Sequence, residues 1–106
     1  MILDSFTTQT PSPIEAIQNE LLTKMGIRLL VKRDDLLHPH ISGNKWRKLK
    51  YNLIEAKKSN QNTLLTFGGA YSNHIAAVAA AGKDFQFKTI GIIRGEKIEP
   101  LNPTLD

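Results

Sequence analysis

The sequence predicts an α/β fold: a partial parallel sheet with flanking helices. Three strand-like runs, at residues 27–32, 63–67 and 88–93, are separated by segments of helical periodicity. Strands that are joined through helices connect by right-handed crossovers and therefore lie parallel. Because parallel sheets are normally covered on both faces and three strands make a small one, we expect the chain to continue into a larger protein.

A helix is predicted after an irregular arm over residues 1–11. Ser12 can cap this helix, Pro13 suits its first position and Glu15 completes a capping box. Apolar side chains then recur at helical spacing until Gly26, which ends the helix. These apolar positions are Ile14, Ile17, Leu21 and Met25.

A loop and a second helix follow the strand at residues 27–32. Pro39 prevents a simple helix through residues 33–40. Residues 44–58 carry an apolar stripe of helical period, and residues 59–62 form a turn after it. The stripe consists of Trp46, Leu49, Leu53 and Ala56.

The third predicted helix lies between the strands at residues 63–67 and 88–93. It covers residues 73–81 and is unusually rich in alanine, which allows close packing on a sheet. Gly82 is its natural C-cap. The last segment, residues 96–106, contains two prolines and shows no periodicity.

The composition limits the classes of function. The net charge of +4 comes from 14 Lys and Arg against 10 Asp and Glu, and seven of the basic residues lie between Arg28 and Lys50. This local excess favours an anionic ligand and does not exclude nucleic acid. Cysteine is absent, so there is no disulfide framework, thiolate metal site or catalytic thiol; a reducing, cytoplasmic location is expected. No apolar run approaches the length of a membrane span.

A lysine stands at the predicted start of the second helix, where the helix dipole favours anions rather than cations. This placement of Lys45 is understandable if its amine is neutral or bonded to a carbonyl carbon. Neighbouring cations such as Arg47 and Lys48 favour a neutral amine, and Lys48 could also meet a phosphate on the same ligand. The alternative is a solvated basic helix face.

Polar residues also follow the glycine pair that ends the strand at residues 63–67. Ligands of open α/β sheets bind beyond the carboxyl ends of the strands, and Gly68 and Gly69 allow a sharp turn there. Ser72 could move a proton near a substrate carbon, and Asn73 could bind a phenolic oxygen or a carboxylate. The alternative is that either residue only caps a helix.

Other chemistries find less support. His38 and His40 are separated by a single proline, and neither they nor His74 have cysteines or a glutamate-rich set nearby, so we expect no metal site. Asp34 and Asp35 could form an acid/base pair, although capping a turn and balancing neighbouring cations is the simpler role.

Nucleotide and nucleic-acid binding are also weakly indicated. No Gly-x-Gly-x-x-Gly fingerprint occurs in the chain. Trp46 and Tyr51 lie among basic residues and could stack on bases. Trp46 falls on the apolar stripe, however, so a place in the core is the better expectation.

Five short stretches, in this order over residues 11–96, carry a family resemblance that none of them would carry alone. They are Pro11-Ser12-Pro13-Ile14, Val31-Lys32-Arg33-Asp34-Asp35-Leu36, Ser42-Gly43-Asn44-Lys45-Trp46-Arg47-Lys48-Leu49, Thr66-Phe67-Gly68-Gly69-Ala70-Tyr71-Ser72-Asn73-His74 and Arg94-Gly95-Glu96. Together they resemble the pyridoxal-phosphate enzymes of the 1-aminocyclopropane-1-carboxylate deaminase and D-cysteine desulfhydrase family, of the tryptophan-synthase-β-like fold group. The resemblance implies that residues 1–106 are the N-terminal portion of a two-domain fold.

The resemblance also implies roles for residues around a pyridoxal 5'-phosphate cofactor. Lys45 looks like the catalytic lysine that holds the cofactor through its aldehyde, and Asn44 belongs to the same binding loop. Lys48 looks like a phosphate contact. Asn73 looks like the partner of the cofactor's 3-oxygen.

On the substrate side, Ser72 looks like a catalytic hydroxyl placed near the α-carbon or carboxylate of the substrate. Asn73 and His74 join it in the implied substrate-binding set, with the role of His74 open because the family varies there. Tyr71 replaces the glutamine that is common before this Ser-Asn pair, which leaves the choice of substrate open.

The implied activity is a pyridoxal-phosphate-dependent deamination or desulfhydration of a small amino acid of the 1-aminocyclopropane-1-carboxylate or D-cysteine type. Its products would be a 2-oxo acid and ammonia. The expected partners are this substrate and, at full length, a second copy in a homodimer, without nucleic acid or membrane. The family's glycine-rich phosphate loop is not found in these residues. The alternative function is a non-catalytic fragment or an α/β module that binds an anion or nucleic acid.

Overall fold

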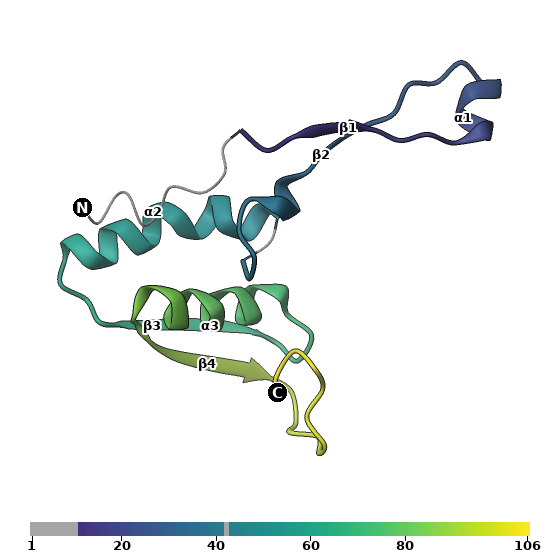
Figure 1. Ribbon diagram of the computed structural model, residues 1–106. Helices are drawn as coiled ribbons and strands as arrows, with labels where there is room; N and C mark the ends of the chain where they lie inside the picture. Colours follow the sequence, from purple (N-terminus) through teal and green to yellow (C-terminus); the bar gives the residue numbers. More distant parts are fainter. Residues whose placement is uncertain (1–10, 42) are drawn as a thin grey trace.

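The computed structural model describes residues 11–41 and 43–106 (Figure 1). In chain order, the elements are β1 (Ile14–Ala16), α1 (Glu20–Lys24), β2 (Leu30–Lys32), a 3₁₀ helix (Asp34–Leu36), α2 (Asn44–Lys58), β3 (Thr63–Gly69), α3 (Asn73–Phe85) and β4 (Lys88–Arg94). The irregular arm predicted at residues 1–11 lies, except for Pro11, outside the described residues, and so does Ser42.

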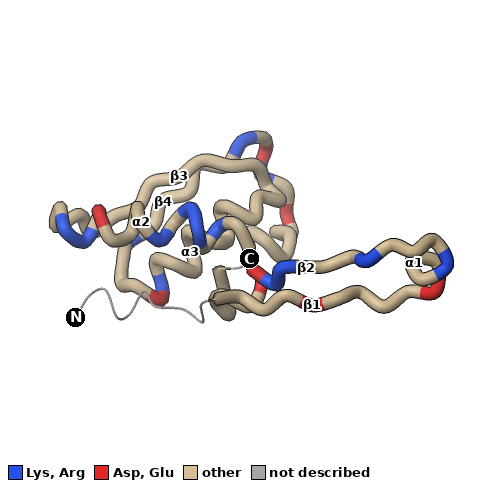
Figure 2. Tube along the Cα trace, turned by 90° about the horizontal axis from the view of Figure 1, so that it is seen from above, with Lys and Arg blue, Asp and Glu red and all other residues tan. Residues whose placement is uncertain are grey.

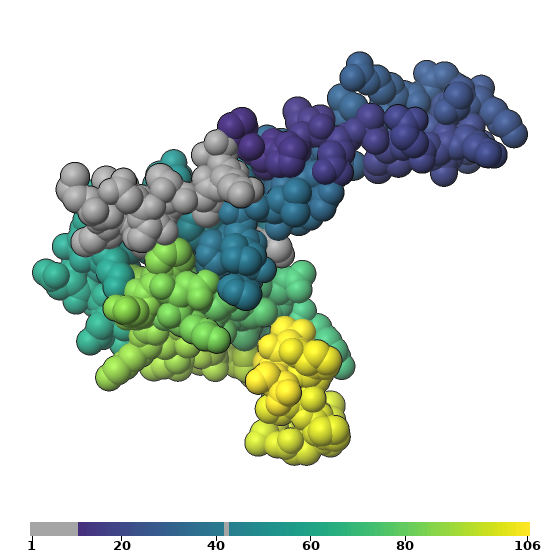
Figure 3. Space-filling view, in the orientation of Figure 1, coloured from purple at the N-terminus to yellow at the C-terminus, as the bar shows by residue number. Residues whose placement is uncertain are grey.

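The first part of the chain forms a hairpin that projects from the body (Figures 1 and 3). β1 pairs antiparallel with β2, in a register that places Ile14 opposite Lys32, and α1 lies at the tip. The helix predicted from Ser12 to Gly26 is therefore wrong except for its last third. A helical turn is capped at Asn19, whose Oδ1 accepts the N–H of Leu21 at 2.9 Å.

The physical reason for this error is a contact that is remote in sequence. Ser12 donates its hydroxyl to Oδ1 of Asp34 at 2.6 Å rather than capping a helix. The N–H of Arg33 also binds the carbonyl of Pro13 at 2.8 Å, at the end of the β1–β2 ladder. These bonds to the residues around β2 favour an extended backbone where the capping-box pattern favoured a helix.

The α/β class is confirmed, with a parallel pair of strands as its sheet. β3 and β4 run parallel, and α3 connects them and packs on one face of the pair (Figure 1). α2 packs against α3. Only two of the three predicted strands share this sheet in the described residues, because the third, around β2, pairs with β1 in the hairpin.

The core lies between α2, α3 and the sheet. α2 has the bounds that its period predicted, and its residues Trp46, Leu49 and Leu53 are buried as expected. Ile54 is buried beside them, and Ala56 packs against the core from a half-buried position. The other buried hydrophobic residues of this core are Leu37, Ile41, Ala77, Val78, Ala81 and Phe87.

Gly82 does not end α3, contrary to the prediction. The helix continues to Phe85 and ends at Gln86, whose φ of 59° is left-handed. Gly82 is buried inside the helix, where an added Cβ would meet the methyl group of Thr89 and would lie 3.1 Å from the carbonyl oxygen of Phe87. Its role is thus to let α3 approach β4 closely.

The outer face of the parallel pair is uncovered. We call its four apolar residues the outer sheet face: Leu65 and Phe67 on β3, opposite Ile90 and Ile92 on β4. Each is at least 47% exposed. The chain exposes 8151 Å², whereas a compact monomer of its mass would expose about 5,900 Å².

Within the described residues, no helix combines the length and apolarity needed to cross a membrane.

Candidate functional site

Lys45 lies at the N-terminus of α2, directly after a backbone turn at Gly43 that only glycine forms easily. Gly43 is the N-cap, with φ 59° and ψ −137°, a conformation that residues with a Cβ avoid. Gly43 has no side chain to bind the first N–H groups of the helix, so these groups are free to face a ligand. Lys45 follows in the first turn and is half-buried.

The N-terminus of α3 presents the second predicted group. Ser72 is the N-cap, and its Oγ accepts the N–H of Ile75 at 3.3 Å. An added Cβ at Gly68 would lie 2.8 Å from this Oγ and 2.6 Å from Cγ1 of Ile75. Gly68 therefore allows the end of β3 to approach the start of α3, which sets the position of Ser72 and of Asn73 after it.

The two helix N-termini share one cavity of about 340 Å³. Its lining residues are His40, Gly43, Asn44, Lys45, Asn73, Ala76 and Ala77. The structure thus brings together three of the predicted residues, Asn44, Lys45 and Asn73, from segments about thirty positions apart. The alanines of α3 supply a small-residue wall, and the volume suits a small ligand.

The other predicted residues are not part of this lining as the structure describes it. Ser72 precedes the cavity residue Asn73 in the chain, and its hydroxyl oxygen caps α3 by accepting the N–H of Ile75. Lys48 is exposed one turn further along α2, where its carbonyl accepts a hydrogen bond from Asn52 at 2.8 Å. His74 is half-buried. The roles of these three residues stay predictions, as do those of Asn44, Lys45 and Asn73.

The Arg47 guanidinium is paired rather than free. Its Nε and Nη2 donate to Asp34 at 2.6 and 3.0 Å, and Ser12 donates to the same carboxylate. These hydrogen bonds, Arg47 first and Ser12 second, hold the pKa of Asp34 well below its usual range. The pair ties the base of the hairpin to α2, and Figure 2 shows acidic and basic residues side by side at this junction. Asp34 and Arg47 are thus structural in this chain.

Arg33 forms a second ion-pair group at the base of the hairpin. Its guanidinium binds Glu15 at 2.8 Å and Asp35 at 2.8 Å. The hydrogen bond with Asp35 raises the pKa of Arg33, with Glu15 as the next cause. Asp35 therefore balances a neighbouring cation, as its simpler interpretation predicted.

Sequence reasoning missed the contribution of His40 to the cavity. His40 lines it, whereas His38 is turned into the core and stacks on Trp46. The described residues contain no group of three or more side chains suited to hold a metal ion. Its position three residues before Gly43, shortly before α2 begins, could have indicated that His40 lies near the site.

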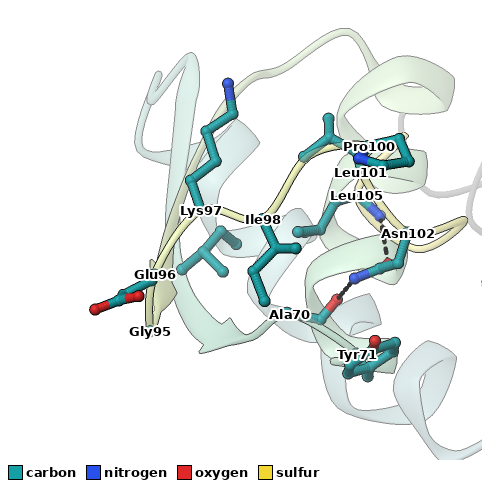
Figure 4. A pocket seen from close by; sticks show the side chains of 11 residues that line it. Ala70, Tyr71, Gly95, Glu96, Lys97, Ile98, Pro100, Leu101, Asn102 and Leu105 are labelled. Atoms are coloured by element: carbon teal, nitrogen blue, oxygen red, sulfur yellow. Dashed lines mark hydrogen bonds between the residues drawn. The ribbon is translucent and has the colours of Figure 1, made fainter.

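A second cavity, of about 430 Å³, lies where β3 and β4 end and the C-terminal segment folds back (Figure 4). Asn102 donates from Nδ2 to the carbonyl of Ala70 at 3.0 Å and so fastens this segment. Tyr71 and a largely apolar set of side chains line the cavity, including Ile93, Ile98 and Leu105. Although it is larger, it contains neither the Lys45 amine nor the Asn73 amide, so the smaller cavity is the better candidate site.

Comparisons with known proteins agree with the resemblance. No model of a known protein family matches the chain. A putative 1-aminocyclopropane-1-carboxylate deaminase of Thermotoga maritima is 41% identical over 97 residues, which are 91% of this chain and 31% of the relative. A bifunctional D-cysteine desulfhydrase/1-aminocyclopropane-1-carboxylate deaminase of Arabidopsis thaliana is 38% identical, over 69% of this chain and 18% of its own length.

A D-cysteine desulfhydrase of Salmonella paratyphi B is 30% identical over 78% of this chain and 25% of the relative. The chain thus spans less than a third of the length of these three relatives. The similarity nevertheless covers most of the described residues, including both helices of the candidate site. Over most of its length, the chain is therefore similar to part of the 1-aminocyclopropane-1-carboxylate deaminases and D-cysteine desulfhydrases.

Proposed function

We propose that this chain supplies the cofactor lysine of a pyridoxal-phosphate-dependent deaminase or desulfhydrase, and that Lys45 is this lysine. The observation that carries the proposal is the cavity shared by Lys45 and Asn73, at the N-termini of α2 and α3. The names of the relatives support the same reaction class.

The donor set at the cavity fits pyridoxal 5'-phosphate. Lys45 offers an amine that reacts with an aldehyde, and the amide of Asn73 can donate to a phenolic oxygen. The uncapped N–H groups after Gly43 favour a negatively charged group. Asn44 lines the cavity beside Lys45, and Lys48 is the proposed phosphate contact from the same helix.

Bound at this site, pyridoxal phosphate would supply an electron sink for chemistry at the α-carbon of an amino acid. The chain's own residues would then orient the substrate and move protons. Ser72 accepts the N–H of Ile75 through its Oγ, which leaves its hydroxyl proton free to be donated to the substrate. Asn73 and His74 are the proposed substrate contacts next to it.

The proposed substrate is a small amino acid of the 1-aminocyclopropane-1-carboxylate or D-cysteine type, which gives a 2-oxo acid and ammonia. The cysteine-type reaction also releases sulfide. Tyr71 is 79% exposed on the turn before Ser72, a position from which it can affect substrate choice. We also propose that the full-length protein forms a homodimer. A cytoplasmic location is part of the same proposal, because a chain without cysteine suits a reducing compartment.

Reductive labelling tests the proposal. The protein is mixed with pyridoxal phosphate and reduced with borohydride, and the modified lysines are located by peptide mass spectrometry. Lys45 should be labelled first, and Lys48 and Lys50 on the same helix serve as internal references. Asn73→Ala should slow the labelling of Lys45 several-fold, because one hydrogen bond contributes about 1 kcal/mol.

Labelling spread evenly over exposed lysines would contradict the proposal and favour the anion-binding alternative. The Lys45→Arg variant keeps the positive charge but cannot form the adduct, so it should show only background labelling. If it is labelled elsewhere as strongly as the wild type is at Lys45, the site assignment is wrong.

A further inference from the structure

His38 fastens the loop that precedes Lys45 to both helices of the candidate site. Its side chain is only 12% exposed. The ring stacks on Trp46 of α2, with centroids 5.0 Å apart and planes at 19°. Its Nε2 lies 3.6 Å from Oδ2 of Asp84 on α3, and its ring lies 6.2 Å from that of Phe85.

The same ring also closes the loop on itself. Nδ1 of His38 accepts the backbone N–H groups of His40 and Ile41, each at 3.1 Å. Ile41 is completely buried, and His40 and Gly43 line the cavity that contains Lys45. The position of this cavity wall thus depends on two hydrogen bonds to one imidazole nitrogen.

This arrangement requires one form of the histidine. A nitrogen that accepts two N–H groups carries no proton, so the proton of the neutral ring lies on Nε2, which faces Asp84. Protonation of Nδ1 would replace the acceptor by a donor and break both bonds. The doubly protonated ring is therefore incompatible with the loop as it stands.

We propose that His38 is a positioning residue whose neutral ring holds the loop segment at His40 and Ile41, so that Lys45 and Asn73 share one cavity, and that its protonation releases this loop. The relevance to catalysis depends on the function proposed above, whereas the release of the loop does not. The titratable groups that face the ring are Asp84 on α3 and His40 on its own loop, and its contact on α2 is the uncharged Trp46.

The direction of the pH dependence follows from the surroundings. Burial lowers the pKa of His38 below its ordinary value of 6.5, while Asp84 opposes this shift and His40 supports it. As the pH falls, the unfolded state or open loop takes the proton first. The loop is thus held fully above pH 6.5 and weakens as the pH falls below it.

Hydrogen exchange of the His40 and Ile41 amides tests the proposal without a cofactor. After correction for intrinsic rates, both amides should exchange on the order of tenfold faster once His38 is protonated, because two hydrogen bonds are lost. In parallel, labelling of Lys45 by pyridoxal phosphate should slow over the same pH range. Nitrogen NMR of His38 should show the Nε2–H tautomer at pH 8.

Three variants separate positioning from simple stability. His38→Asn places an oxygen acceptor the same number of bonds from the backbone as Nδ1, so it should restore protection without the pH dependence. His38→Ala should lose protection at every pH. Asp84→Asn removes the charge that opposes the shift, so the loss of protection at low pH should become larger.

Protection in wild type that is independent of pH from 8 to 5, or an Nδ1–H tautomer at pH 8, would overturn the proposal. If Lys45 is never labelled but the amides behave as described, the proposed function fails while the positioning role stands. His38→Asn and Asp84→Asn keep the test decisive if His38→Ala does not fold.

Discussion

A single methyl group at Gly68 should disturb the start of α3, whereas the same change at Gly69 should not. A Cβ at Gly68 would lie 2.6 Å from Cγ1 of Ile75 and 2.9 Å from Cβ of Ser72. Ordinary contacts begin at 3.4 Å, so the neighbours must move by about 0.8 Å. A Cβ at Gly69 would meet nothing closer than 3.9 Å.

The expected size follows from these contacts. Overpacking of this kind costs about 1–3 kcal/mol. Alanine has a lower conformational entropy than glycine in the unfolded state, which offsets this cost by about 0.4–1 kcal/mol. Gly68→Ala should therefore lower the free energy of unfolding by up to about 2.6 kcal/mol. Gly69→Ala keeps only the entropic gain and should raise it by about 0.4–1 kcal/mol.

Urea unfolding followed by the fluorescence of Trp46, the single tryptophan, measures both variants. Trp46 is 2% exposed in the core, so its emission reports on the packing of α2 against α3. Equal unfolding free energies for Gly68→Ala, Gly69→Ala and the wild type would refute the close approach of β3 to Ser72.

Three further predictions concern the core, the hairpin and the site loop. Leu53→Ala, at a position 1% exposed, should destabilise the protein by about 2–5 kcal/mol, whereas Leu65→Ala, at a position 57% exposed, should cost less than half as much in the same urea titration. Because folding lowers the pKa of Asp34, the unfolded state takes up a proton first when the pH falls below about 4. The wild type should therefore lose stability on acidification, and Asp34→Asn should lose less. Equal slopes of unfolding free energy against pH for the two proteins would contradict the pairing with Arg47. Gly43→Ala should cost about 1–3 kcal/mol because of its backbone conformation and should slow the labelling of Lys45, whereas Gly26→Ala, also at positive φ but remote at the hairpin tip, should leave the labelling rate unchanged.

The elements that local patterns predicted well are those whose patterns and tertiary contacts agree. α2 has the predicted bounds because its apolar stripe, from Trp46 to Leu53, is also the surface that packs on α3. β3 and β4 lie parallel as expected because α3 joins them. The sequence also predicted the starts of α2 and α3, because a glycine precedes the polar site residues in each case. Gly43 precedes Lys45, and Gly68 precedes Ser72.

The errors occurred where a remote contact outweighed a local preference. Ser12 binds Asp34, 22 positions away, and the predicted first helix becomes a strand. Gly82 is the usual C-cap by sequence, yet the approach of Thr89 makes it a packing residue inside α3. The hydrogen bonds from the loop to His38 likewise depend on a loop geometry that spacing does not reveal.

Local periodicity and short motifs were enough to predict the α/β class, the second helix, the family resemblance and the candidate residues Lys45 and Asn73. Three features became visible only in the folded chain: Lys45 and Asn73 line one cavity with His40, Arg47 is bound to Asp34, and His38 stacks on Trp46. Those outcomes depend on which surfaces of distant segments meet, and a contact between segments is a property of the packed chain rather than of any one stretch of it.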